Sequence, residues 1–158
     1  MSDGDLRDSI EFDKNVIGVD VPAGTHQVTR EEIVAYARAL GETNPLYLDE
    51  EAAKAGPYGT IIAPPGFYTS IRLHTRPDPK VRSSNKNMGY IAGQNVEYFE
   101  PIRAGDTISA KAHVADVYTK TGRTGTLIFV VHHITYSNQY GRTVIEVEMS
   151  HFGSETMR

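Results

Sequence analysis

Two residues in the stretch Gly41-Glu42-Thr43-Asn44-Pro45-Leu46-Tyr47-Leu48-Asp49 could take part in acid–base chemistry. The carboxylate of Glu42 could act as a general acid or base. A phenol ordinarily titrates at about pH 10, so Tyr47 could donate a hydrogen bond but would exchange protons less readily than an imidazole. The structural alternatives are that Glu42 is a solvated residue beside a helix end and that Tyr47 serves in packing.

Two further residues of this stretch are expected to have structural roles. Asn44 should fix the loop through hydrogen bonds from its side chain to the backbone. Asp49 should cap a short helix.

The histidines do not follow a metal-binding pattern. His132 and His133 are neighbours on a predicted strand, so they point to opposite faces and cannot hold one ion together. His113 is expected on an exposed strand face, and His74 at the end of a helix, where a structural role is favoured. Because no zinc-ligand spacing occurs, neither a metal nor a cofactor is expected. A group of cations near one predicted loop could meet ligand phosphates, although a solvated loop is the simpler interpretation. The cations are Arg72, Arg76, Lys80 and Arg82.

The size and composition favour one globular domain. The chain has 158 residues, 39% hydrophobic and 23% charged, with a net charge of −4 and no basic run, so a nucleic-acid site is not expected. The absence of cysteine excludes disulfides and thiolate chemistry and fits a cytoplasmic protein. No apolar run is long enough to cross a membrane. The acidic N-terminus, residues 1–16, is interpreted as a flexible leader before a single domain at residues 17–158.

Three helices are predicted in the first half. The first extends from Thr29 to about Leu40, with a capping box formed by Thr29 and Glu32. The second is short and begins at Asp49. The third extends from about Pro65 to His74, because proline is tolerated at a helix start and the preceding residues are apolar. An exposed loop follows, from Arg76 to Met88.

The second half has the pattern of antiparallel strands. The predicted strands are Gln94–Glu100, Thr107–Tyr118, Leu127–Val131 and Thr143–Phe152, separated by turns rich in glycine. The strand Leu127–Val131 is apolar on both faces and should lie at the centre of the sheet, covered on both sides. Helices followed by a meander of strands indicate an α+β protein.

Four separate segments resemble the MaoC-like hydratase/dehydratase family, over roughly Ile17 to Phe152. The stretch Gly41–Asp49 resembles the family signature G-D-x-N-P-[LIV]-H-x-D. The four segments beside it are Tyr36–Gly41, Tyr58–Pro65, Glu97–Asp106 and Thr135–Gln139. The Ala63-Pro64-Pro65 sequence is similar to the N-terminal or non-catalytic subunit type. The resemblance implies the hotdog fold, an antiparallel sheet wrapped around a central helix.

The resemblance also implies a site with three altered positions. The family's catalytic Asp corresponds to Glu42, its His to Tyr47, and a glycine whose N–H faces the thioester oxygen to Pro65, which has no N–H. The N–H groups of Gly66 and Phe67 could take over that role, so these residues and Asn44 are candidates for substrate binding. Three changes at three positions favour a degenerate site.

The family's activity leads to three alternatives for this chain. It could be a subunit of an (R)-specific enoyl thioester hydratase or 3-hydroxyacyl dehydratase, holding the acyl chain while a second hotdog subunit supplies Asp and His. It could be an autonomous enoyl-CoA hydratase that uses Glu42 and Tyr47. It could also be a non-enzymatic module that binds acyl thioesters. In each case the ligand is an acyl-CoA or acyl-carrier-protein thioester, and a homodimer or heterodimer is expected because a small sheet leaves an open edge.

Overall fold

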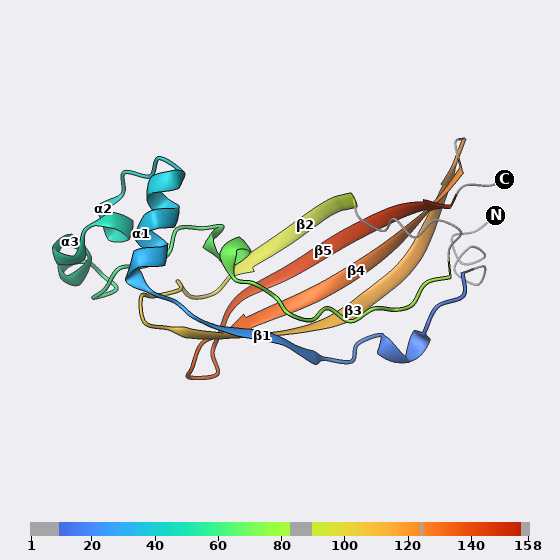
Figure 1. Cartoon of the computed structure of the whole chain (residues 1–158), viewed down its shortest axis with the longest axis horizontal. Helices are drawn as coiled ribbons and strands as arrows, with labels where there is room; N and C mark the ends of the chain where they lie inside the picture. Colours follow the sequence, from blue (N-terminus) through green and yellow to red (C-terminus); the bar gives the residue numbers. More distant parts are fainter. Residues whose placement is uncertain (1–9, 83–89, 124, 156–158) are drawn as a thin grey trace.

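The computed structural model describes residues 10–82, 90–123 and 125–155. Its elements in chain order are a 3₁₀ turn η2 (Lys14–Val16), β1 (Val21–Gln27), α1 (Arg30–Ala39), α2 (Pro45–Leu48), α3 (Glu50–Ala55), a 3₁₀ turn η3 (Phe67–Ser70), β2 (Tyr90–Tyr98), β3 (Thr107–Gly122), β4 (Gly125–Ser137) and β5 (Thr143–Glu155). The helices gather at one end of a long sheet, as Figure 1 shows.

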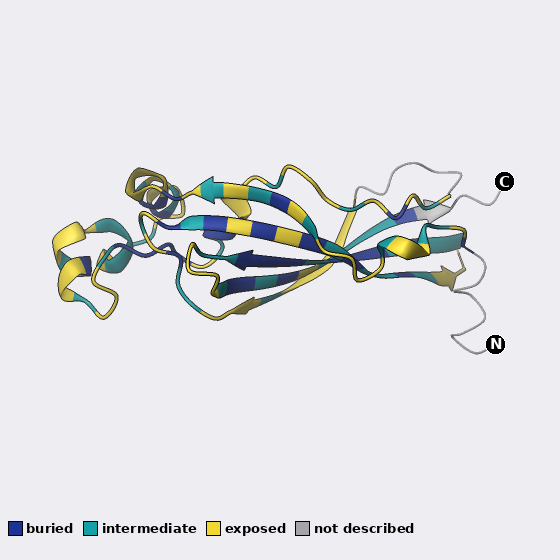
Figure 2. Cartoon of the chain, turned by 90° about the horizontal axis from the view of Figure 1, so that it is seen from below, coloured by how far each residue is buried: buried dark blue, intermediate teal, exposed yellow. Residues whose placement is uncertain are grey.

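The five strands form one antiparallel sheet in the order β1-β3-β4-β5-β2. The four strands predicted from the sequence are present, and β4 is central as expected. The strand β1 was not predicted, since Pro22 and Gly24 interrupt its alternation of apolar and polar residues. Buried and exposed residues alternate along much of β3, and Figure 2 shows such banding in the sheet, so one face carries most of the core. The expected cover on both faces of β4 is found in part: on the second face Val131 is buried, whereas Leu127 and Phe129 are half-buried.

Local capping interactions form the helices as the sequence predicts. The Thr29 side chain accepts from the N–H of Glu32, and the Glu32 carboxylate accepts from the N–H of Thr29, so both members of the capping box are present at α1. Asn44 caps α2 by accepting from the N–H of Leu46 at 3.0 Å, and Asp49 caps α3. The structural roles expected for Asn44 and Asp49 are confirmed.

The predicted helix from Pro65 to His74 is wrong, because the structure has only the four-residue turn η3 at that place. Gly66 precedes the turn with a left-handed backbone, φ 92°. The hydroxyls of Thr69 and Ser70 donate to the carbonyls of Gly66 and Phe67 at 2.8 and 2.7 Å, which occupies acceptors that a longer helix would use. The chain then continues in an extended form.

This extended part, residues 71–82, is called the crossing segment, because it runs along the sheet as Figure 1 shows. It is held to its neighbours by backbone bonds: His74 N–H donates to Ala23 O at 2.8 Å, and Arg82 N–H donates to Glu11 O at 2.9 Å. His74 is therefore exposed on an extended chain, not at a helix end as predicted.

The core has two parts along the inner face of the sheet. The larger part joins α1, η3 and the helical half of the sheet, with Ile33, Phe67 and Ile134 among its most buried members. The smaller part lies at the other end and includes Ile10 and Val114. Residues 1–9 of the predicted leader lie outside the described residues, but Ile10 is only 8% exposed and packs onto the sheet.

Candidate functional site

A cleft of about 270 Å³ lies where the helical end of the chain meets β2. Three backbone bonds position its walls: Ile62 N–H donates to Leu46 O, Ala63 N–H to Ile102 O, and Ala104 N–H to Ile61 O. These bonds join α2, the segment before η3 and the turn after β2. The lining residues are Tyr47, Tyr58, Ile62, Ala63, Pro64, Pro65, Tyr68, Tyr98, Phe99, Glu100, Pro101, Ile102 and Ile145.

The structure brings two of the predicted site residues into this cleft. Tyr47 reaches it from α2, and Pro65 from the segment before η3. Glu42 and Asn44 are not among the described residues that line it. Glu42 follows α1, where its N–H donates to Ala37 O at 3.0 Å, and the Asn44 side chain is used in capping α2.

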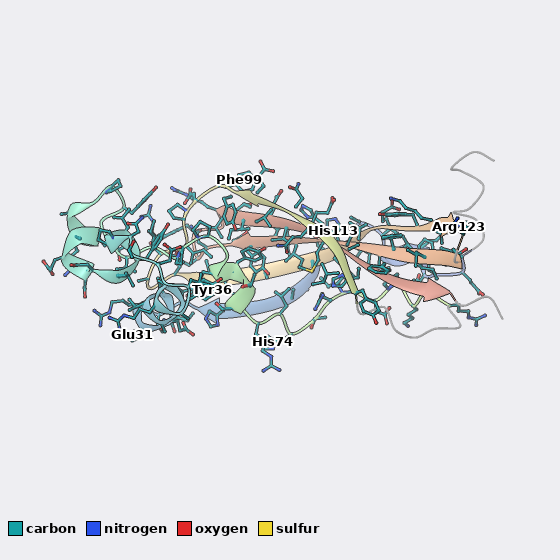
Figure 3. The ribbon with its side chains drawn as sticks, turned by 90° about the horizontal axis from the view of Figure 1, so that it is seen from above. Glu31, Tyr36, His74, Phe99, His113 and Arg123 are labelled. Atoms are coloured by element: carbon teal, nitrogen blue, oxygen red, sulfur yellow. The ribbon has the colours of Figure 1, made fainter. Side chains whose placement is uncertain are left out.

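The Phe67 amide is not available for a substrate. Its N–H donates to Pro64 O at 3.1 Å, and its ring is 2% exposed and packs edge-on against Tyr36 with centroids 5.5 Å apart. A thioester oxygen could therefore use the Phe67 N–H only in competition with Pro64 O, because the turn itself uses that donor. Gly66 lies close to the Tyr36 hydroxyl, which would be 3.1 Å from a Cβ at that position. Figure 3 shows Tyr36 beside this turn.

Several tyrosines and one carboxylate that were not singled out from the sequence also line the cleft. Glu100 is the only carboxylate among the described lining residues, and its Oε1 lies 3.3 Å from Nη1 of Arg142. Tyr98 and Phe99 lie at the end of β2 and are about half exposed, and Figure 3 marks Phe99 there. The segment Glu97–Asp106 resembles the family, and this resemblance was the one feature of the sequence that could have indicated Tyr98, Phe99 and Glu100.

A second cavity lies beside the cleft along the inner face of the sheet, and we call it the groove. It has a volume of about 380 Å³ and shares Tyr68 with the cleft. Its floor and walls are mainly apolar. The lining residues are Tyr68, Thr69, Ile71, Arg72, Leu73, Arg76, Ile91, Gln94, Ile134, Tyr136, Val147 and Met149. Two of the four predicted loop cations, Arg72 and Arg76, belong to it, whereas Arg82 pairs with Glu11 at 3.0 Å.

The phenols between the cleft and the groove are hydrogen-bond donors at neutral pH. Burial, with the neighbouring Tyr68, raises the pKa of Tyr136 to about 12. Burial, with the neighbouring Tyr98, also raises the pKa of Tyr68, whose hydroxyl donates to Gln94 Oε1 at 3.4 Å. These groups can orient a polar ligand atom, but they do not exchange protons readily near pH 7.

A pair of histidines lies on the inner face beneath the crossing segment. His132 is 8% exposed, and its Nε2 is 2.9 Å from Pro77 O. The ring of His151 packs edge-on against the ring of His132, with centroids 5.7 Å apart. Nε2 of His151 is 3.2 Å from Nη1 of Arg76. Burial lowers the pKa of both imidazoles, and the Arg76 guanidinium adds to this, whereas for His132 the Pro77 carbonyl and Asp78 act in the opposite direction.

We expect this pair to make the fold sensitive to mild acid. Because the folded pKa of each histidine lies below the ordinary value of 6.5, the unfolded chain takes up protons first as the pH falls below 6.5. The free energy of unfolding should then fall by at most about 1.4 kcal/mol per pH unit for each histidine, until the folded pKa is reached.

Urea unfolding between pH 5 and 8 measures this dependence, and His132→Gln should make it shallower. His133→Gln is the matched control on the opposite face. An unchanged slope in His132→Gln would contradict the assignment.

Two further strand histidines, His113 and His133, lie on the outer face. His113 Nδ1 is 2.7 Å from Asp20 Oδ1, and its ring stacks on His133 with centroids 5.1 Å apart. His132 and His133 thus face opposite sides, as the sequence predicts. Within residues 10–82, 90–123 and 125–155, no group of three His, Cys, Asp or Glu residues could hold a metal ion. The same residues include no helix of the length and apolarity needed to span a membrane.

The comparisons with known proteins agree with this architecture. The family described as "FAS1-like, dehydratase domain region" matches residues 15–147. A UPF0336 protein from Saccharopolyspora erythraea is 33% identical over 116 residues, which are 70% of this chain and 74% of that protein. A 3-hydroxybutyryl-CoA dehydratase from Methylorubrum extorquens is 32% identical over 102 residues, 61% of this chain and 59% of that enzyme.

A solved structure shows the same fold at lower identity. It is the complex of truncated HadBC, a 3R-hydroxyacyl-ACP dehydratase from Mycobacterium tuberculosis, with a TM-score of 0.68, 22% identity and coverage of 89% of this chain and 99% of that one. The sheet, with a central helix reduced to η3, is thus a variant of the hotdog fold. Because the family match spans most of the sequence, the chain belongs to the FAS1-like dehydratase domain region family, and its fold is the hotdog fold.

Proposed function

We propose that this chain is the acyl-holding subunit of an (R)-specific enoyl thioester hydratase or 3-hydroxyacyl thioester dehydratase in the cytoplasm. One observation supports this most: the cleft and the groove form adjoining cavities with Tyr68 as a shared wall, and their described lining contains no histidine and no aspartate. The chain offers apolar space for an acyl chain without the usual acid–base pair.

The chemistry explains why a partner is needed. Hydration of an enoyl thioester requires an activated water at the β-carbon, a proton for the α-carbon and a donor to the thioester oxygen. The hydroxyl groups of Tyr47 and Tyr68 can donate hydrogen bonds, and Glu100 is held by Arg142. A second hotdog subunit would bring the missing His and Asp to the cleft.

The open edge of the sheet supports the partner. The strand β2 is exposed along almost its whole length, and its large side chains include Tyr90 at 64%, Ile91 at 61% and Tyr98 at 49% exposure. A row of unpaired backbone groups with apolar neighbours is a surface for adding another strand. The structurally similar HadBC is itself a complex of dehydratase subunits.

A turnover assay tests the proposal. The substrate is crotonyl-CoA or a longer enoyl-CoA. A positioned general acid or base raises the rate of such a reaction by about 10²- to 10⁴-fold, and the chain alone should lack this acceleration. A catalytic partner should restore the hydration rate by about the same factor. Brisk hydration by the pure chain would refute the acyl-holding role.

Tyr47 in the cleft supports a second candidate, the autonomous hydratase. The two candidates differ in the effect of Glu42→Gln and Tyr47→Phe. An autonomous enzyme would lose its rate in either variant, whereas the complex proposed here should keep its rate within about threefold in Glu42→Gln. Binding without turnover, even with a partner present, would instead indicate a non-enzymatic acyl-thioester module.

A further inference from the structure

The groove carries two positive charges and no negative one. Arg72 and Arg76 line it from the crossing segment, and its described lining contains no carboxylate. Among the residues that the structure describes, neither guanidinium forms an ion pair. Arg76 donates to Nε2 of His151 at 3.2 Å, and burial lowers the pKa of that imidazole, so it is neutral at pH 7. In a chain with a net charge of −4, two arginines without a carboxylate need an explanation.

The other polar side chains of the groove leave donors for a ligand. Gln94 Oε1 accepts from the Tyr68 hydroxyl at 3.4 Å, so the amide nitrogen of Gln94 is the end that can donate. Tyr136 has a pKa of about 12 and keeps its proton at neutral pH. The Thr69 hydroxyl already donates to Gly66 O at 2.8 Å. A ligand group bound here must therefore accept hydrogen bonds, and several of them.

The charge of Arg76 acts on the buried floor of the groove. Burial and Tyr68 raise the pKa of Tyr136, and the Arg76 guanidinium acts in the opposite direction. The same guanidinium adds to the burial that lowers the pKa of His132 and His151. Because Tyr136 is only 3% exposed, a positive charge that acts on it can also attract an anion into the groove.

A carboxylate at the end of an acyl chain matches these features. Its two oxygens accept up to about four hydrogen bonds and fit the planar fork of a guanidinium. The hydrocarbon part would contact the apolar residues of the groove, Ile134, Val147 and Met149. A phosphate dianion fits less well, because its higher charge costs more to remove from water beside these residues. From Ile145 in the cleft to Met149 in the groove, four residues along β5 span about 13 Å, which a medium-length acyl chain can cover.

On the basis of the proposed function, we propose that the acyl chain held by this subunit ends in a second carboxylate, which Arg72 and Arg76 bind in the groove. The substrate class is then the monothioesters of dicarboxylic acids. The two arginines determine specificity for the acyl tail, remote from the reacting carbons, while the thioester lies in the cleft beside Tyr47 and Pro65.

Calorimetric titration of the full chain, with any subunit that co-purifies, tests this proposal. The probes are octanoyl-, decanoyl- and dodecanoyl-CoA and the ω-carboxy counterpart of each. At the chain length that spans the two cavities, the carboxylated thioester should bind about tenfold more tightly than the plain one, the effect of a hydrogen bond to a charged group. High salt should reduce this preference, because both arginines are exposed. Equal or weaker binding of all three carboxylated thioesters would overturn the proposal.

Variants locate the effect. Arg72→Gln and Arg76→Gln should each remove most of the preference for the carboxylate, while the plain thioesters bind as before. Arg82→Gln is the matched control: it removes the same charge from the crossing segment outside the groove, where Arg82 pairs with Glu11 at 3.0 Å. Arg72→Gln decides the question if Arg76→Gln, which also loses the contact with His151, fails to fold.

The outcomes separate this inference from its alternatives. If both arginine variants weaken plain and carboxylated thioesters equally, the arginines bind the phosphates of the carrier, and the carboxylate subsite is refuted. If the plain thioesters bind and the carboxylate adds nothing, only the subsite fails. If no thioester binds, the acyl-holding role fails as well.

Discussion

Phe67→Ala is expected to lower the free energy of unfolding by about 3–5 kcal/mol, the cost of truncating a fully buried aromatic side chain. Phe67 is 2% exposed and packs edge-on against Tyr36 of α1, with centroids 5.5 Å apart. The effect should be large because η3 is a single turn and the Phe67 ring is buried in the cluster that joins α1, η3 and the sheet. Urea unfolding followed by circular dichroism measures it.

Phe99→Ala is the matched control, because the same truncation is made at a ring that is 50% exposed. Its cost should stay within about 1 kcal/mol. Similar losses in both variants would mean that η3 does not anchor α1 to the sheet.

The sequence predicted those parts of the fold that depend on short-range interactions. The capping box at Thr29 and Glu32 needs only residues three apart, so it could be read directly. The alternation of apolar and polar residues along β3 could be read in the same way, because only one face of the strand is buried. The helix expected after Pro65 failed because its pattern did not reveal that Gly66 is left-handed and that two hydroxyls bond back to the turn.

The candidate site was predictable only in part, because its walls come from segments far apart in the sequence. Tyr47 and Pro65 were found through the family resemblance, and both line the cleft. Tyr68 and Glu100 were not found, since their neighbours are set by the pairing of residues 61–63 with residues 102–104. The histidine pair was also missed, because His132 and His151 become neighbours only through the register of β4 and β5.

Replacing both Ile91 and Tyr98 by lysine is expected to weaken association with a second hotdog subunit by at least about 100-fold. The two side chains lie at opposite ends of β2 and are 61% and 49% exposed. In the described part of the chain, β2 has one strand neighbour, β5, so its other edge is open. Lysine on an open edge disfavours the addition of a strand. Losing one anchor residue at an interface typically costs 2 kcal/mol or more, and about 2.8 kcal/mol corresponds to 100-fold.

Sedimentation velocity of the chain with its partner measures this change. Because both positions are exposed, the double variant should remain folded, which thermal unfolding can verify. Tyr140→Lys is the control, since Tyr140 is 77% exposed in the turn between β4 and β5, away from the edge. If the double variant associates as tightly as the control, the partner binds elsewhere, and the missing acid–base pair would have to reach the cleft from another side. If association is lost in the double variant and kept in the control, β2 is the edge to which the partner binds.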